Sequence, residues 1–271
     1  MSVPSRWEAD VSQVLSGAEP LAHDGPTEVG VLVCHGFTST PQSVRAWAEH
    51  LAAAGCAVRC PLLPGHGTRW QDLNGTGWHD WYRAAERELL ALRERCRSVF
   101  VFGQSMGGTL ALRLAQRHPD IAGLVLVNPS VTTRRTGAAL LPLLARPPLS
   151  WVVPSLPGVA GDIAAPGVRE LAYDRMPLRA MASLRRLWSV VRAELGEVRQ
   201  PLVLYRSAVD HVVEPVNAEL VLAGVRSADV TSYVLEDSFH VATLDHDAPA
   251  LFAGSVEFIH RIHHERAEEP A

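Results

Sequence analysis

A serine between two glycines is the residue of this chain best placed to do chemistry. Ser105 is the centre of Gly103-Gln104-Ser105-Met106-Gly107, with an apolar stretch before it and an apolar face at helical spacing after it. A strand that turns sharply into a helix crowds the positions two residues before and after the turn, and glycine relieves that crowding. The pattern therefore predicts that Ser105 is a nucleophile exposed above the end of a sheet.

A serine hydroxyl is a weak nucleophile at neutral pH, so it needs a general base and a carboxylate that orients the base. His240 follows a strand-like stretch at 230–234 and a break at 236–238, and we expect it to be the base. Asp210 lies just beyond another strand-like stretch at 202–205, and we expect it to be the acid. The chain order serine, aspartate, histidine is the one that this kind of nucleophile turn predicts.

Other polar residues near these positions compete for the same roles. We interpret His211 as a loop histidine, because adjacent side chains cannot both point into one triad. Asp237, Asp245 and Asp247 lie near His240 in the sequence. Closeness along the chain does not place a carboxylate behind an imidazole, so Asp210 is preferred.

The negative oxygen that forms during acyl transfer needs two hydrogen-bond donors. The backbone N–H of Met106, the residue after the serine, is the first candidate. The second is the N–H of Phe37, which follows the apolar stretch 29–34 and His35-Gly36. Gly36 would allow the tight turn that directs this N–H at the substrate. We therefore predict an oxyanion hole formed by Phe37 and Met106.

Four segments together resemble the bacterial carboxylesterase and monoacylglycerol lipase family of α/β-hydrolases: HGFTSTPQSVRAWAEHLAAAGCAVRCPLLPGHG, GQSMGG, SAVDHVVEP and SFHVATLDHD. The resemblance extends over about four-fifths of the chain. It implies a serine esterase that acts on short to medium acyl esters or on monoacylglycerols through an acyl-enzyme. It places the nucleophile on Ser105, the acid on Asp210, the base on His240 and the oxyanion donors on Phe37 and Met106. His66, in the PGHG loop, is interpreted as structural.

Apolar strand-like stretches alternate with amphipathic helical stretches along most of the chain. This alternation predicts an α/β fold, an α/β-hydrolase core with a mostly parallel sheet covered by helices on both faces. The strands are expected at 29–34, 57–62, 98–102, 123–127, 202–205 and 230–234. The helices are expected at 41–54, 78–95, 106–117, 179–194, 216–223 and 249–264, with Gly55 ending the first of them.

The alternation fails between residues 130 and 200, where the sequence is apolar, proline-rich and irregular. We therefore expect a core formed by 1–130 and 197–271 and a cap or lid insertion at 131–196. Several apolar side chains of the insertion are expected to pack on the core or to line an acyl pocket. They are Leu140, Leu141, Leu143, Leu144, Leu149, Trp151, Val152 and Leu156. The insertion shows little of the family pattern, which leaves the substrate preference open.

Composition limits the classes of partner. The 271 residues carry a formal net charge of −4, and the 25 basic residues, all arginines, are dispersed in the sequence, so nucleic-acid binding is not indicated. No stretch is apolar enough for a signal peptide or a stable membrane insertion. The four cysteines show no metal-ligand spacing, and we expect reduced thiols in a cytoplasmic protein. We expect a small ester or monoacylglycerol substrate, with neither a metal nor a cofactor, whereas the oligomeric state stays open.

Other activities are compatible with the same residues. A serine, histidine and aspartate can also support acyl transfer or thioester cleavage, which an assay with glycerol or a coenzyme A thioester would separate from ester hydrolysis. Cofactor-free haloperoxidase or perhydrolase activity is a further alternative. A non-catalytic binding protein of the same fold is disfavoured, because such a protein usually loses a member of the triad.

Overall fold

A seven-stranded sheet forms the centre of the molecule. The computed structural model describes residues 14–26, 28–134, 145–146 and 149–268. The strand order is β1-β3-β2-β4-β5-β8-β9. Every neighbouring pair is parallel except β1 and β3, which are antiparallel. The strands are β1 (Leu21–His23), β2 (Val29–Cys34), β3 (Ala57–Cys60), β4 (Ser98–Gln104), β5 (Gly123–Val127), β8 (Leu202–Ser207) and β9 (Val230–Leu235).

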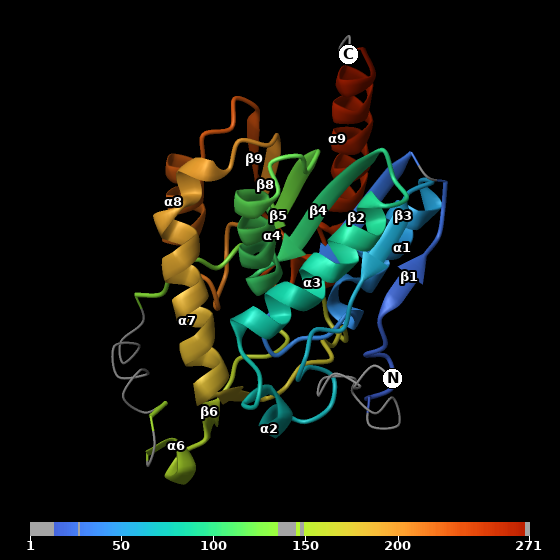
Figure 1. The fold of residues 1–271 in the computed structure, drawn as a ribbon. Coiled ribbons are helices and arrows are strands. Elements are labelled where there is room, and N and C mark those ends of the chain that lie inside the picture. Colours follow the sequence, from blue (N-terminus) through green and yellow to red (C-terminus); the bar gives the residue numbers. More distant parts are fainter. Residues whose placement is uncertain (1–13, 27, 135–144, 147–148, 269–271) are drawn as a thin grey trace, which may run out of the picture.

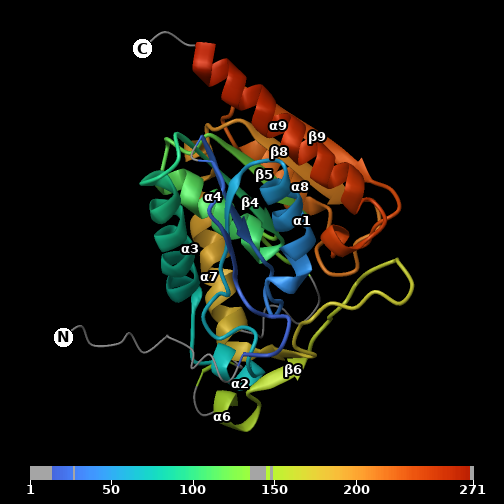
Figure 2. The ribbon, with the colours of Figure 1, turned by 90° about the vertical axis from the view of Figure 1, so that its right-hand side faces the viewer.

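Helices cover both faces of this sheet, as Figures 1 and 2 show. One face carries α3 (Trp78–Arg93), α4 (Met106–Arg117), α7 (Leu178–Ala193) and α8 (Val216–Gly224). The other carries α1 (Gln42–Ala53) and α9 (Ala248–Glu268). Short helices lie at α2 (Trp70–Leu73), α6 (Leu149–Val152), η3 (Leu195–Glu197) and η4 (Ala242–Leu244). The predicted mostly parallel α/β fold is therefore confirmed.

The central strands are buried on both faces, because successive side chains point to opposite sides. In β4, Phe100 and Phe102 pack toward α1 and α9, whereas Val99 and Val101 pack toward α3 and α4. All seven residues of β4 are buried. The strand that leads to Ser105 is thus fixed by a hydrophobic core on each side.

The regular elements lie close to their predicted ranges, and the differences have local causes. The strand expected at 57–62 ends at Cys60, because Pro61 has no N–H to donate to a neighbouring strand. Helix α9 begins at Ala248 and extends past 264, farther than its apolar pattern indicated. Strand β1 and helix α2 were not expected, since three or four residues are too few to show a period.

Between β5 and β8 the chain forms a separate two-stranded sheet and the long helix α7. Strands β6 (Ser155–Pro157) and β7 (Arg175–Pro177) pair antiparallel. Figure 1 shows β6 and α6 at one end of the molecule, near α2. Leu140, Leu141, Leu143 and Leu144 lie outside the described residues, as does the side chain of Trp151.

One expectation for this segment was wrong. The side chain of Val152 is 80 % exposed and Leu149 is 40 % exposed, so neither is buried on the core. Leu156, by contrast, packs against the core as expected. Leu149 and Val152 are three residues apart in the helix α6 and so lie on one of its faces, and that face is turned to the surface. Among the described helices, none is both long and apolar enough to cross a membrane.

Candidate active site

Ser105 occupies a strained turn between β4 and α4. Its φ of 54° and ψ of −117° are unusual for a residue with a side chain. The turn is held by its neighbours: the Ser105 N–H donates to Val127 O at 2.9 Å, and Ser105 O accepts from Ser130 N at 3.2 Å. The strained conformation is therefore fixed by β5 and the residues that follow it, as expected where a side chain must be held in one direction.

The two flanking glycines are required by close backbone contacts. A Cβ at Gly103 would lie 2.2 Å from Gly107 O, and a Cβ at Gly107 would lie 2.0 Å from Cys34 O. No side chain can be accommodated at either position without a shift of backbone. The glycines thus serve the purpose that the sequence pattern predicted for them.

His240 and Asp210 are brought together from loops that follow β9 and β8. His240 Nδ1 lies 2.8 Å from Asp210 Oδ2, and both side chains are more than nine-tenths buried. Asp210 Oδ1 also accepts the N–H groups of Val212 and Val213 at 2.8 and 2.7 Å. Burial raises the pKa of Asp210, but its hydrogen bond with His240, the charge of that residue and the two N–H groups together bring the pKa below its usual value. Asp210 is therefore held as a carboxylate behind the imidazole.

Ser105 makes no side-chain hydrogen bond to His240 or to any other described residue in this structure. Nucleophile and base contacts are often long without substrate and tighten only in the complex. The loop of His240 is nevertheless anchored next to the serine: His240 O accepts from the side chain of Gln104, the residue before Ser105, at 3.4 Å.

The backbone around the two predicted oxyanion donors lies next to Ser105. A Cβ at Gly36 would lie 3.5 Å from Ser105 Cβ, so the turn that carries Phe37 packs against Ser105. Among the described residues, neither the Phe37 N–H nor the Met106 N–H has a hydrogen-bond acceptor. Thr38, the next residue, has a positive φ of 64° and donates its hydroxyl to Phe37 O at 2.6 Å.

Asn128 is a site residue that the sequence did not reveal. It follows β5 directly and has a φ of 45°. Its side-chain amide donates to His240 O and to Ser207 Oγ, both at 2.9 Å, and its carbonyl oxygen accepts Ser207 N at 2.8 Å. Asn128 thus joins the ends of β5 and β8 to the histidine loop. The sequence does show Val127-Asn128-Pro129 at the end of a predicted strand. It does not show that Asn128 binds Ser207 and His240, because these partners lie about 80 and 110 residues further along the chain.

Asp162 and Asp245 join the histidine loop to the segment between β6 and β7. Asp162 accepts the His240 N–H at 3.2 Å and contacts the ring and the N–H of His211 at 2.7 and 3.0 Å. Asp245 accepts the N–H groups of four residues, Ala164, Ala165, Phe239 and His246. His211 therefore binds Asp162 and lies outside the Asp210–His240 pair, as interpreted from the sequence. The carboxylates of Asp162 and Asp245 fix the backbone of the loops whose N–H groups they accept.

His35 and His66 pack together beneath the oxyanion turn. Their ring centroids are 5.0 Å apart, and His66 also packs against Phe37 and Trp81. Burial lowers the pKa of His35 to about 4, and burial together with His35 lowers the pKa of His66 well below its usual value. Both rings are neutral at physiological pH and hold backbone: His35 accepts the Leu63 N–H at 3.2 Å, and His66 Nδ1 lies 3.2 Å from Pro64 O, which agrees with a structural PGHG loop. The described residues contain no group of three or more potential metal ligands.

Comparisons with known proteins agree with this arrangement. Residues 25–247 match the family described as serine aminopeptidase, S33. Over 251 residues the chain is 42 % identical to a thermostable monoacylglycerol lipase of Bacillus sp. (strain H-257), and the match covers 90 % of this chain and 95 % of the relative. A carboxylesterase of Bacillus subtilis (strain 168) is 24 % identical, with 86 % and 92 % covered.

A similar solved structure is described as a metagenome-derived lipolytic enzyme. It superposes with a TM-score of 0.87 at 39 % identity and covers 92 % of this chain and 100 % of its own. The same fold occurs, at 19 % identity and a TM-score of 0.76, in a monoacylglycerol lipase of Paleococcus ferrophilus, with 90 % and 98 % covered.

Proposed function

The chain belongs to the serine aminopeptidase S33 family, and from this premise we propose that it is an esterase that cleaves monoacylglycerols and short- to medium-chain carboxylic esters. The observation that carries this proposal is the 42 % identity with a monoacylglycerol lipase over nearly the full length of both chains. Ester hydrolysis by a serine hydrolase agrees with the fold, with the turn at Ser105 and with the buried pair formed by His240 and Asp210.

In the proposed mechanism Ser105 Oγ attacks the ester carbonyl while His240 Nε2 takes its proton. Asp210 holds the opposite ring nitrogen and stabilises the imidazolium that forms. The negative oxygen of the tetrahedral intermediate accepts hydrogen bonds from the Phe37 and Met106 N–H groups. The alcohol leaves with the proton from His240, and water activated by the same histidine releases the acid from the serine.

We assign residues 131–196 to a cap over this site. Two observations support the assignment. Helix α7 packs against α3 and α4, the latter being the helix that begins after Ser105. Asp162, from the connection between β6 and β7, binds the His240 N–H. A cap held in this way would limit the length of the acyl chain that reaches the serine.

We further infer a reducing compartment, the cytoplasm, for this protein. All four cysteines are free and buried. Secreted proteins of this size that contain several cysteines usually pair them. Fractionation of cells that produce the native chain, followed by immunodetection, tests this inference, and recovery of the protein with the secreted fraction would contradict it.

The experiment that tests the function is a substrate series on the wild-type protein and on Ser105→Ala. We expect the wild type to hydrolyse p-nitrophenyl butyrate and monoacylglycerols with saturating kinetics. Ser105→Ala should lose at least about 10³-fold in kcat, because no other group can form the acyl-enzyme. Ser232→Ala removes an exposed hydroxyl on β9 and is the matched control. Undiminished turnover by Ser105→Ala would refute the proposed nucleophile, whereas a wild type inactive on all esters would refute the esterase.

A further inference from the structure

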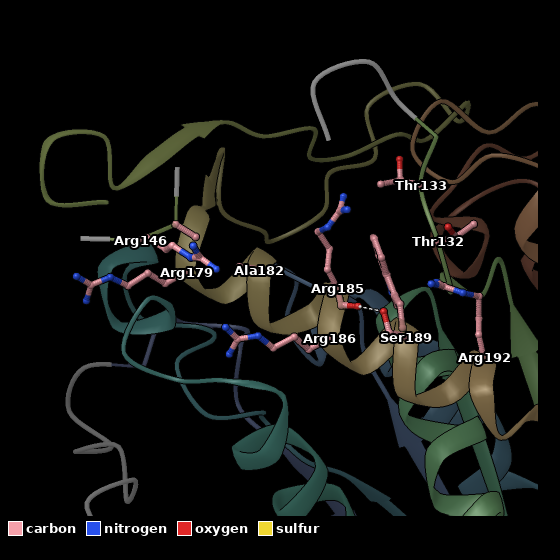
Figure 3. Close-up of a pocket in the computed structure, with 11 residues that line it drawn as sticks. Thr132, Thr133, Arg146, Arg179, Ala182, Arg185, Arg186, Ser189 and Arg192 are labelled. Carbon is pink, nitrogen blue, oxygen red and sulfur yellow. Dashed lines mark hydrogen bonds between the residues drawn. The ribbon is translucent and has the colours of Figure 1, made fainter. Parts of the chain in front are cut away.

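A pocket rich in arginine lies on the segment between β5 and β8, apart from the proposed active site. It has a volume of about 550 Å³ and is formed by α7, by Thr132 and Thr133 in the segment after β5, and by the short stretch at 145–146 (Figure 3). Five of its eleven lining residues are arginines: Arg146, Arg179, Arg185, Arg186 and Arg192. Neither a carboxylate nor any of Ser105, Asp210 and His240 is among the lining residues.

The arginines are concentrated by the sequence of α7. From 178 to 193 this helix contains four arginines and no aspartate or glutamate. Arg185 and Arg192 are seven residues apart, which places them on one face of the helix. Figure 3 shows both side chains pointing from α7 toward the segment that carries Thr132 and Thr133, with Arg146 and Arg179 at the other end of the pocket.

Positive charge is concentrated in the segment 131–196, whereas the rest of the chain is negative. The expectation that the basic residues are dispersed was therefore wrong. Residues 131–196 contain nine arginines and four carboxylates, a formal charge of +5. The remainder of the chain carries a formal charge of −9. A positive pocket on an otherwise negative protein attracts anions to one place, and the nearby low-dielectric walls strengthen that field.

Hydrogen bonds to the core fix the wall of the pocket before any ligand arrives. Trp188 Nε1 donates to Ser130 Oγ at 3.2 Å, and Arg192 donates to Val131 O. The N–H groups of Val131 and Thr132 both donate to Asn217 Oδ1 at 2.7 Å. Glu214, which does not line the pocket, accepts the Arg134 N–H at 2.8 Å and lies 3.5 Å from Thr133 Oγ1. A fixed wall lowers the entropy that binding would cost.

The pocket brings the positively charged side chains of Arg185 and Arg192 close to each other. Burial and the positive charge of Arg185 both lower the pKa of Arg192. A multiply charged anion in the pocket would relieve this repulsion. A single carboxylate brings one negative charge, whereas a phosphate group brings nearly two negative charges and three oxygens that match guanidinium geometry.

We propose that the arginine pocket, lined by Arg146, Arg179, Arg185, Arg186 and Arg192, is a binding site for a phosphate group. The group can belong to a soluble diphosphate or to the headgroup of an anionic phospholipid, and both present the same chemistry to the arginines. The site is distinct from the ester-cleaving site and does not depend on the activity assigned to Ser105.

The first measurement is calorimetric titration of the full chain with inorganic pyrophosphate at constant low ionic strength. We expect saturable binding at one site that weakens as salt is added. The double variant Arg146→Gln/Arg185→Gln should weaken binding by about tenfold for each arginine removed, equivalent to about 1.4 kcal/mol each. The double variant Arg87→Gln/Arg261→Gln removes the same charge from exposed positions on α3 and α9 and should bind within about twofold of the wild type.

The second measurement is cosedimentation with vesicles of phosphatidylglycerol, compared with vesicles of phosphatidylcholine alone. Binding of pyrophosphate identifies a soluble ligand as the source, and arginine-dependent binding of phosphatidylglycerol vesicles without pyrophosphate binding identifies a headgroup. Either outcome supports the site, provided that Arg146→Gln/Arg185→Gln keeps its circular dichroism spectrum and its rate on p-nitrophenyl butyrate. The proposal is overturned if neither probe binds, or if the pocket variant loses no more affinity than the control variant.

Discussion

Three residues with a strained backbone conformation lie at the proposed site. Thr38, Ser105 and Asn128 are the described non-glycine residues with a positive φ, at 64°, 54° and 45°. Thr38 follows the proposed oxyanion donor Phe37, Ser105 is the proposed nucleophile, and Asn128 binds the loop that carries His240. Each such conformation costs about 1–3 kcal/mol, which the surrounding contacts must offset. Strain is thus concentrated where side chains and N–H groups must point in fixed directions.

The close contact between Gly107 and the backbone of Cys34 predicts a large loss of stability for Gly107→Ala. The new Cβ would lie 2.0 Å from Cys34 O, in a strand buried on both faces. We expect the free energy of unfolding in urea to fall by at least about 3 kcal/mol. Gly196→Ala is the matched control, because its Cβ would be 3.5 Å from the flexible side chain of Arg226. Equal stabilities of the two variants would contradict this account of the turn.

The pairing of Asp210 with His240 predicts that Asp210→Asn impairs turnover without unfolding the protein. The amide cannot stabilise the imidazolium and favours the wrong tautomer, so kcat on p-nitrophenyl butyrate should fall by about 10²–10⁴-fold. Asp247→Asn is the control, because Asp247 is close to His240 in the sequence but accepts the Asp237 N–H instead of contacting the imidazole. A similar loss in both variants would argue against Asp210 as the orienting carboxylate.

At the scale of elements, loops at the carboxyl ends of the strands form the site and are connected by buried carboxylates. Asp162 joins the β6–β7 connection to the loop of His240. Asp245 binds N–H groups from both of these segments, and Asn128 joins β5 to β8 and to the histidine loop. Because the donors and acceptors come from different elements, removal of one carboxylate loosens two segments at once.

Asp245→Asn should therefore destabilise the protein in a pH-dependent way. Burial raises the pKa of Asp245, but its four N–H donors lower it below the usual value. The carboxylate therefore contributes stability above the unfolded-state pKa of about 3.9, and this contribution is lost as the pH falls through the lower, folded-state pKa.

Urea unfolding at several pH values measures this effect. At neutral pH we expect Asp245→Asn to be less stable than the wild type by about 1.5–3 kcal/mol, the range for hydrogen bonds to a charged group. The difference should begin to shrink below about pH 4, where the carboxyl of the unfolded chain takes up a proton, and it should vanish once the pH is below the lower pKa of the folded protein. Asp237→Asn, at an exposed position of the same loop, is the control. A stability difference independent of pH would show that the carboxylate charge is not the cause.

At the scale of the whole molecule, two cores hold the sheet and exclude its thiols from solvent. Cys34, Cys56, Cys60 and Cys96 are all at most 9 % exposed. Burial raises the pKa of Cys56 to about 11 and that of Cys60 to about 12, and it raises the pKa of Cys34 further. The thiolates that react with electrophiles are therefore scarce in the native state.

We predict that native protein reacts only slowly with Ellman's reagent at neutral pH. In guanidinium chloride all four thiols should react within the mixing time, because unfolding restores their ordinary exposure and pKa. Absorbance at the thionitrobenzoate band measures both rates. Rapid reaction of one or more thiols in the native protein would contradict the burial of that cysteine. Cys96, at the edge of the core, is the one expected to react first.

The sequence by itself determined what depends on neighbouring residues along the chain. The turn at Ser105 follows from glycine spacing, and the long strands and helices follow from the periodicity of their apolar residues, so their ranges were nearly correct. The roles assigned to Ser105, Asp210, His240, Phe37 and Met106 remain predictions that the geometry supports and that kinetics must test. The three-residue strand β1 and the four-residue helix α2 were not predicted, because neither is long enough to show the period of its own structure.

Only the tertiary structure decided which distant residues meet. Asn128 reaches the histidine loop 112 residues further along the chain, and Asp162 reaches His240 across 78 residues. The arginines of α7 gather with Arg146 around one pocket, although in the sequence they had suggested no patch. A single polar or charged side chain leaves no periodic pattern in a sequence. Its partner is chosen by chain folding, which brings one loop within hydrogen-bonding distance of another.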